Sequence, residues 1–312
     1  MKYINTLKEG DTITEKYLCK FKQELKNKNG KPYYSLKLQD KTGMIEAKVW
    51  DLNKNIEDFS VYDYVQIEGN VILYQEEYQL NVQKISKASP EELDPTDYIP
   101  ATSKDINILL EQLNKLISSV KNVYIRRLLE SFFLNQNFIK EFKYHSAAKS
   151  VHHAYLGGLL EHTVTVAKIG ESLCEHYPIA NKELVIAGGL LHDIGKLYEL
   201  SQFPENDYTD VGNMIGHISI GVELIHDHIK EIENFPADLE MLIKHIVLSH
   251  HGEYEFGSPK RPKTIEAMIV HSADNTDSRI KIVEEVLLAD MTNNNYAGYN
   301  RILNRNIRKT MF

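Results

Sequence analysis

The spacing of hydrophobic and polar positions changes near residue 100. Up to residue 86, apolar residues alternate with polar ones, which is typical of strands with one face exposed to solvent. From residue 106 onwards, apolar residues recur every three or four positions, which is typical of amphipathic helices. The pattern therefore predicts a β unit followed by an all-α unit.

The alternating region predicts about five strands and one short helix. Ile13, Leu18 and Phe21 are among the first-strand residues expected to face the interior, and a short helix is expected at 52–59. The strands are expected at 12–25, 32–40, 44–51, 61–74 and 78–86. Five strands with a helix between the third and the fourth follow the order of an OB-fold, a small Greek-key barrel. Another small barrel is the alternative.

Residues 89–104 contain three prolines and no periodicity, which predicts a linker that the prolines stiffen. Helices are expected at 106–120, 123–135, 154–176, 182–193, 216–232, 237–250, 263–275 and 279–290. We therefore expect an OB-fold domain at 1–88, a linker at 89–104 and a helical domain at 105–312. The helical domain ends in a basic tail that carries Arg301, Arg305 and Arg308.

The composition narrows the class of protein. A net charge of −8 argues against a protein that binds nucleic acid with its whole surface. It does not exclude a local basic patch that binds nucleic acid. Two distant cysteines, Cys19 and Cys174, make no disulfide framework, and no apolar run is long enough to span a membrane, so we expect a cytoplasmic protein. All 13 histidines lie between His145 and His271, which suggests that the two units have different tasks.

One short stretch, GGLLHDIGKLYEL at 188–200, ends an apolar helix with ionisable residues. His192 and Asp193 are adjacent, and adjacent side chains on a helix point about 100° apart. Both can serve one metal ion only at a helix end, where Gly195 would let the backbone turn. The alternative is that the carboxylate bridges two ions. Either arrangement requires further ligands.

Further ligands are available on other apolar helices. They are His162, His217, His250, His251 and Asp274. A single core histidine is more often structural, but buried imidazole and carboxylate groups need partners, and one metal centre in a helical bundle would satisfy them together.

The ordered set resembles the HD-domain family of metal-dependent phosphohydrolases. In this resemblance His162, His192, Asp193 and Asp274 occupy the four defining places, over roughly residues 145–290. His217 and either His250 or His251 match the additional ligands of the dinuclear members. The resemblance implies phosphoester hydrolysis, with Asp193 among the catalytic residues.

Imidazole and carboxylate ligands without a nearby cysteine suit Mn, Fe, Co, Ni or Zn. We expect two Mn²⁺ ions, with Fe or Co as alternatives. Lys196 is expected to contact a phosphate oxygen, or else to be a surface lysine that closes a helix. His152 and His153 are expected to line the substrate channel or protonate a leaving group, and we take His153 as the catalytic one. Asp277 is expected to hydrogen-bond to a metal ligand or to contact the phosphate, and a surface ion pair is the alternative.

A lysine-rich stretch in the β unit predicts nucleic-acid binding. Seven lysines and one acid lie between Lys16 and Lys37, with aromatic residues interleaved. Lysines that track a backbone beside aromatic rings that stack on bases are how OB-folds hold single strands. The alternative is a solvated strand edge. The candidate nucleic-acid contacts are Lys20, Lys22, Lys26, Lys28, Tyr33, Tyr34 and, in the helical unit, Arg279.

An OB-fold followed by an HD domain resembles the YhaM family of bacterial 3′-5′ exoribonucleases, on the stretches HHAYLGGLLEHTVTVA and LLHDIGK. The resemblance implies release of nucleoside 5′-monophosphates from single-stranded RNA, in preference to DNA. A homo-oligomer is compatible with the sequence. One alternative is a cyclic-dinucleotide phosphodiesterase, but the GYP signature of that class is absent from HHGEYEFGSP. A nucleotide triphosphohydrolase would leave His217 and His250 unexplained, and an RNA-binding adaptor with a structural metal is the non-enzymatic alternative.

Overall fold

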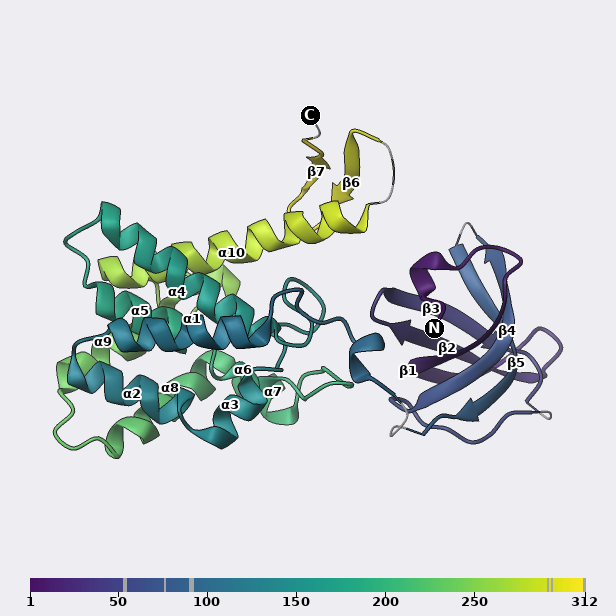
Figure 1. Cartoon of the computed structure of the whole chain (residues 1–312), viewed down its shortest axis with the longest axis horizontal. Coiled ribbons are helices and arrows are strands. Elements are labelled where there is room, and N and C mark those ends of the chain that lie inside the picture. Colours follow the sequence, from purple (N-terminus) through teal and green to yellow (C-terminus); the bar gives the residue numbers. More distant parts are fainter. Residues whose placement is uncertain (53–54, 76, 90–92, 291, 293, 311–312) are drawn as a thin grey trace. The chain divides into compact units, whose positions relative to one another are not determined.

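The computed structural model describes residues 1–52, 55–75, 77–89, 93–290, 292 and 294–310. The chain divides into two compact units (Figure 1). The first consists of Met1–Ala101 with Phe203–Glu205, and the second of Thr102–Gln202 with Asn206–Phe312. Within the described residues, no helix is long and apolar enough to cross a membrane.

The first unit is a closed five-stranded barrel, which confirms the predicted OB-fold. Its strands are β1 (Thr12–Lys26), β2 (Pro32–Asp40), β3 (Gly43–Val49), β4 (Tyr64–Tyr74) and β5 (Glu77–Lys87). They pair in the order β1-β2-β3-β5-β4, and β4 closes onto β1. All pairs are antiparallel except β3 with β5. Alternate residues such as Leu36, Leu38, Ala47 and Val49 fill the interior.

Two expectations for the barrel were wrong. Phe21 is exposed rather than internal, because a β-bulge between Cys19 and Phe21 reverses the side to which the following side chains point. The helix expected at 52–59 is not formed by its described part, where Ile56 instead makes a parallel bridge with Ile85. Residues 53–54 lie outside the described residues.

The end of the expected linker packs onto the barrel. Tyr98 and Ile99 are buried, and the Gln39 side chain donates a hydrogen bond of 3.0 Å to the Tyr98 carbonyl oxygen. Residues 90–92 of the expected linker lie outside the described residues. The described part from residue 93 to Ala101 therefore belongs to the first unit, and the second unit begins at Thr102.

The second unit is a helical bundle. Its helices are α1 (Ile106–Ser119), α2 (Val123–Phe133), α3 (Gln136–Phe142), α4 (Gly158–His176), α5 (Lys182–Leu191), α6 (Lys196–Glu199), α7 (Asp210–Ile215), α8 (His217–Lys230), α9 (Ala237–Ser249) and α10 (Ile265–Ala289). The short helices α3, α6 and α7 were not expected, and α10 is one helix where two were expected.

Helix α5 occupies the centre of the bundle. All its residues from Leu184 to Leu191 are buried, and it packs against α2, α4, α9 and α10. Asn181 caps its first turn by accepting hydrogen bonds from the backbone N–H groups of Glu183 and Leu184. The helix ends at Leu191, so the residues that follow it begin inside the core.

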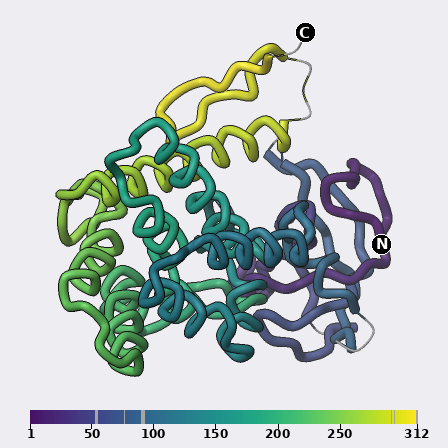
Figure 2. Tube along the Cα trace, turned by 60° about the vertical axis from the view of Figure 1, so that its left-hand side comes forward, coloured from purple at the N-terminus to yellow at the C-terminus, as the bar shows by residue number. Residues whose placement is uncertain are grey.

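The C-terminal segment, expected only as a basic tail, forms a hairpin. Strands β6 (Tyr296–Asn300) and β7 (Arg305–Arg308) pair with each other and lie beside α10 (Figure 2). Ile307 is buried and anchors the hairpin, while its arginines are exposed. Strands this short give little periodicity in a sequence rich in Asn.

Candidate metal centre

Five segments of the helical unit bring ionisable side chains to one point in its interior. The residues are His162 on α4, His192 and Asp193 after α5, His217 at the start of α8, His250 and His251 after α9, and Asp274 on α10. Five of the seven are buried, and His251 and Asp274 are partly buried. The structure therefore brings together every metal ligand that the sequence suggested.

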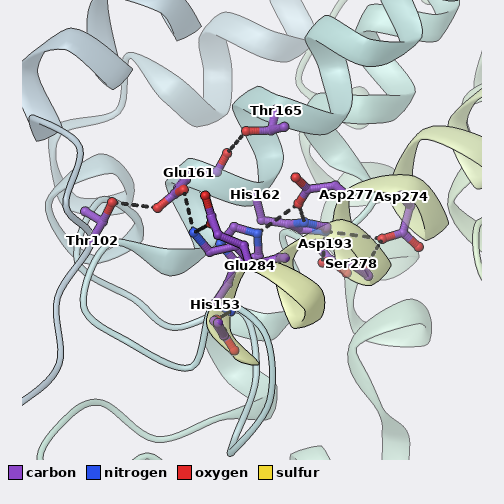
Figure 3. Close-up of polar contacts among 12 residues, drawn as sticks. Thr102, His153, Glu161, His162, Thr165, Asp193, Asp274, Asp277, Ser278 and Glu284 are labelled. Atoms are coloured by element: carbon purple, nitrogen blue, oxygen red, sulfur yellow. Dashed lines mark hydrogen bonds and ion pairs between the residues drawn. The ribbon is translucent and has the colours of Figure 1, made fainter. Parts of the chain in front are cut away.

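One set of ligand atoms surrounds Oδ2 of Asp193. This oxygen lies 3.3 Å from Nε2 of His162 and 3.2 Å from Nε2 of His192. The two imidazole nitrogens are 3.1 Å apart. Oδ1 of Asp274 lies 3.3 Å from Nε2 of His162, and Figure 3 shows Asp193 and Asp274 close to that ring. These four residues form the first subsite.

A second set faces the other oxygen of Asp193. Oδ1 lies 3.5 Å from Nε2 of His217 and 3.6 Å from Nε2 of His250. His251 belongs to the same group, since ligand atoms of His217, His250 and His251 all lie within 4.8 Å of one another. These three histidines and Oδ1 form the second subsite, so Asp193 is shared between the two.

Three buried atoms of the second subsite have no hydrogen-bond partner among the described residues. They are Asp193 Oδ1, His217 Nε2 and His250 Nε2. Buried polar atoms are normally paired, so three orphans that face one another indicate a missing ligand. A metal ion is a partner that a carboxylate and two imidazoles can share.

Each histidine uses its other ring nitrogen to contact an outer partner. Nδ1 contacts Asp277 Oδ2 at 2.7 Å in His162, and Glu199 Oε1 at 2.8 Å in His217. The Nδ1 atoms of His192, His250 and His251 contact the carbonyl oxygens of Gly189, Val247 and Phe256. Such outer contacts fix the orientation of a metal-binding imidazole and leave Nε2 free for the ion. Glu199 was not anticipated from the sequence, where it lies three residues after Lys196.

The electrostatics keep Asp193 and His250 in their metal-binding protonation states. Burial would raise the pKa of Asp193, but neighbouring His192 and Lys196 hold it well below its usual range, so the carboxylate is ionised. Burial lowers the pKa of His250 well below the usual value, and His251 acts in the same direction. A neutral imidazole has the lone pair that a metal requires.

The first subsite concentrates negative charge. Burial would lower the pKa of His162, but hydrogen bonds to Asp193, Asp274 and Asp277 raise it well above the usual value. Three carboxylates therefore act on one ring in a buried space. A divalent cation meets the same electrostatic demand, and the nitrogen and oxygen donors fit divalent transition metals.

Lys196 and Gly195 complete the turn after α5. The Lys196 ammonium lies 2.7 Å from Asp193 Oδ2, and its side chain is mostly buried rather than at the surface. Gly195 has ordinary helical dihedral angles, so it does not supply the unusual turn that we expected. It permits close approach instead, because a Cβ there would lie 2.0 Å from the carbonyl oxygen of His217.

His153 lies beside His162 and shares the partner Asp277 with it. Its Nε2 contacts Asp277 Oδ2 at 2.8 Å, and the Tyr155 hydroxyl contacts its Nδ1 at 2.9 Å (Figure 3). Both ring nitrogens are therefore engaged. The expected catalytic role of His153 stays a prediction.

Arg279 is exposed on α10. It follows Asp274 by five residues, which places it about 140° around the helix from that ligand. Its predicted contact with nucleic acid would therefore lie outside the metal centre.

The predicted lysine contacts on the barrel differ in their surroundings. The Lys20 ammonium donates to the carbonyl oxygens of Pro204 and Glu205, which belong to the same unit. Lys22 donates to the Phe59 carbonyl oxygen and lies over the Tyr34 ring. The remaining two, Lys26 and Lys28, are on the surface of the barrel.

A stacked aromatic pair, of which Trp50 is exposed and Tyr33 is partly buried, lies on the outer face of the barrel. Tyr33 stacks on Trp50 with ring centroids 4.6 Å apart, whereas Tyr34 packs against the core. Phe21 is also exposed, at 41%. Trp50 and Phe21 were not among the predicted contacts. The bulge that turns Phe21 outwards has no clear signal in the sequence, but the single Trp of the chain, at the end of a predicted strand, was a signal that could have been used.

Comparison with known proteins agrees with this architecture. The family model of the HD domain matches residues 159–279, and that of an OB-fold nucleic acid binding domain matches residues 18–88. Among solved structures, the HD domain of the L. monocytogenes phosphodiesterase PgpH is 21% identical and covers 48% of this chain and 80% of its own, with a TM-score of 0.31.

Curated relatives extend over both units. The 3′-5′ exoribonuclease YhaM of Listeria innocua serovar 6a is 34% identical over 280 residues, and that of Listeria welshimeri serovar 6b is 33% identical over 280 residues. Each alignment covers 89% of this chain and 88% of the relative. On this identity and coverage, the chain belongs to the family of the 3′-5′ exoribonuclease YhaM.

Proposed function

We propose that this protein is a metal-dependent 3′-5′ exoribonuclease that hydrolyses single-stranded RNA and releases nucleoside 5′-monophosphates. The observation that carries the proposal is the position of Asp193, whose two carboxylate oxygens face two separate sets of ligands. The names of the relatives support the polarity and the substrate.

The two subsites fit two divalent ions, and we propose Mn²⁺, with Fe or Co as alternatives. When bound, such ions lower the pKa of a bound water and neutralise charge on the phosphodiester. Asp193 holds the two subsites at a fixed separation, and Glu199 and Asp277 orient His217 and His162. The Lys196 ammonium, beside Asp193, is in reach of a phosphate oxygen bound at the centre.

We propose that the outer face of β1, β2 and β3 binds the RNA strand. Residues paired across these strands share a face, so Phe21 lies beside Lys37, on the side opposite the core residues Leu36 and Leu38. Tyr33 and Trp50 extend this face with a stacked aromatic pair. Exposed rings and lysines on one face suit bases and phosphates of a single strand.

Lys26 pairs with Pro32 and is in phase with Lys22 along β1, so it lies on the other side of the strand from Phe21. The surface lysines Lys26 and Lys28 therefore stay in this proposal as phosphate contacts of the barrel outside the aromatic face. Lys20, Lys22 and Tyr34 are engaged in contacts within the barrel, so we expect them to contribute less to RNA binding than Lys26 and Lys28 do. A homo-oligomer is not required for either subsite, because all seven ligands come from one chain.

The alternatives are less well supported. A cyclic-dinucleotide phosphodiesterase would have no need of an aromatic and basic face on a barrel. An adaptor with a structural metal would have a centre closed by protein ligands. Here the second subsite has three ligand atoms without a partner among the described residues, around a shared carboxylate, an arrangement suited to metal-assisted hydrolysis.

Digestion of a 5′-labelled single-stranded RNA by the purified protein with Mn²⁺ tests the proposal. We expect a ladder that shortens from the 3′ end and nucleoside 5′-monophosphates as products. Cyclic di-AMP and cyclic di-GMP, offered in parallel, should be hydrolysed far more slowly. Cleavage inside the RNA, or faster hydrolysis of a cyclic dinucleotide, would contradict the assignment.

A further inference from the structure

A turn before α4 has an unfavourable backbone. His152 and His153 have φ values of +22° and +60°, so two successive residues with side chains occupy the left-handed side of the φ range. Residues other than glycine adopt positive φ infrequently, and they do so where the surrounding structure imposes it. Such strain is concentrated at functional sites.

Contacts from three directions hold this turn. The His153 ring is engaged by Asp277 and Tyr155, and its backbone N–H donates to Glu285 Oε1 at 3.3 Å. Its carbonyl oxygen accepts from the backbone N–H of Ala147. The first residue of α4, Gly158, lies so close that a Cβ there would be 2.0 Å from the same oxygen. The contacts fix His153 and thereby determine where its neighbour lies.

The neighbour, His152, has a ring nitrogen without a partner. Its Nδ1 is buried and makes no hydrogen bond to the described residues. The centroid of its ring lies 6.5 Å from that of His153, whose ring is in turn 5.2 Å from that of His162 in the metal centre. Lys196, His162 and Asp274 of the centre act electrostatically on the same ring. Burial, with Lys196 acting in the same direction, lowers the pKa of His152 to about 4, so the ring is neutral and carries one N–H donor.

We propose that His152 donates a hydrogen bond to a non-bridging oxygen of the scissile phosphate, beside Lys196, and that His153 is the positioning residue that holds His152 there. The sequence suggested His153 as the catalytic residue of the pair, whereas this proposal gives the contact with substrate to His152. The inference rests on the proposed hydrolysis of phosphodiesters, but not on RNA as the substrate. The competing explanation is that the turn is strained for structural reasons alone.

The backbone geometry supplies a discriminating pair of variants. His152→Gly removes the ring and relieves the positive φ. His152→Asn keeps a donor and tolerates this backbone better than most residues. His176→Asn, at an exposed histidine at the end of α4, is the matched control.

Each variant of the full chain would be assayed with Mn²⁺ on two substrates, a single-stranded RNA and bis(p-nitrophenyl) phosphate. Bound metal and melting temperature would be measured on the same samples. We expect His152→Gly to lower kcat about 100-fold on both substrates, as removal of one fixed donor to a developing oxyanion does. Metal content should stay at the native value, and the melting temperature should be equal or higher. His152→Asn should recover part of kcat, and the His176 control should match the native protein.

A second readout addresses the contacted atom. RNA with a single phosphorothioate at the scissile position replaces one non-bridging oxygen by sulfur, a weaker hydrogen-bond acceptor. Sulfur should slow hydrolysis of one of the two phosphorothioate diastereomers in the native protein. The slowing of that diastereomer should be smaller in His152→Gly, because this variant already lacks the hydrogen bond from His152.

The inference is overturned if His152→Gly keeps kcat within threefold of native, or if its loss of activity follows loss of metal. It is also overturned if His152→Asn and His152→Gly are equally impaired and the thio effects are unchanged. A native protein that hydrolyses the small diester but not RNA would refute the proposed exoribonuclease while leaving His152 tested. Hydrolysis of neither substrate would refute both.

Discussion

At the metal centre, the two nitrogens of each histidine ring have separate tasks. Nε2 of His162 faces Asp193 and Asp274, while its Nδ1 contacts Asp277. The sequence predicted the ligands because imidazole and carboxylate groups on apolar helices need a common partner. It could not predict Glu199 as the outer partner of His217, since that contact depends on how α6 and α8 meet.

Glu199→Gln tests the outer contact of the second subsite. The amide can still accept from the His217 backbone N–H, but it removes the negative charge beside the ring. We expect Mn²⁺ affinity at the second subsite to fall about 10- to 100-fold, with the first subsite unaffected. Calorimetric titration of the metal-free protein measures both affinities. Glu255→Gln, at an exposed glutamate, is the control, and equal affinities in both variants would contradict the role given to Glu199.

At the scale of elements, the position of the site depends on close contacts between helices and turns. The apolar periodicity of the sequence does not predict these contacts. The apolar pattern predicted α5 and its end beside His192, because burial on all sides leaves a clear signal. It divided α10 into two helices, since the polar run from Ser272 to Ser278 interrupts the apolar stripe. That run contains Asp274 and Asp277, so the polar residues that interrupt the apolar stripe of α10 are those of the site.

Gly195→Ala tests the close approach of the turn to α8. The new Cβ would lie 2.0 Å from the His217 carbonyl oxygen, so the start of α8 has to move. We expect a loss of about 1–3 kcal/mol in the free energy of unfolding, together with weaker metal binding at the second subsite. Gly221→Ala, one turn further along α8, is the control, because its nearest neighbour would be 3.6 Å away. Denaturant unfolding that gives the same stability for both variants would show that the turn tolerates a side chain.

At the scale of the whole molecule, the chain joins a barrel with an aromatic and basic face to a helical unit with a metal centre. The order and class of the two units could be predicted, because the change from period two to period 3.6 is unambiguous over stretches this long. The exposed face could be predicted only in part, since a single bulge in β1 decides that Phe21 points outwards.

Trp50→Ala tests whether the barrel face stacks on bases. Removal of one stacking ring should weaken binding of a long single-stranded RNA by about 1–2 kcal/mol, or roughly 5- to 30-fold. Tyr177→Ala is the control, because Tyr177 at the end of α4 is 53% exposed and Trp50 is 43% exposed. Fluorescence anisotropy with labelled RNA measures both, and equal weakening of RNA binding would show that this face has no special role.

Lys26→Gln with Lys28→Gln tests the phosphate contacts of the same unit. For each lysine that pairs with a phosphate, neutralisation should reduce the slope of log K against log salt by roughly 0.7, as for single strands in general. Lys8→Gln with Lys115→Gln removes the same charge at exposed positions elsewhere. A slope that stays at the native value in the Lys26 and Lys28 variant would show that these lysines only cover a solvated strand edge and do not contact phosphate.

The central claim is that Asp193 joins two metal subsites in one hydrolytic centre, and counting the bound ions while measuring RNA hydrolysis tests it most directly. Native mass spectrometry of the Mn²⁺-loaded protein should give two ions per chain, and His217→Ala should retain one and lose most of its activity. Asp193→Asn should bind fewer than two ions and show no measurable hydrolysis, whereas Asp238→Asn, at an exposed position, should match the native protein. Two ions and native turnover in Asp193→Asn, or a loss of both ions or of neither in His217→Ala, would contradict the account.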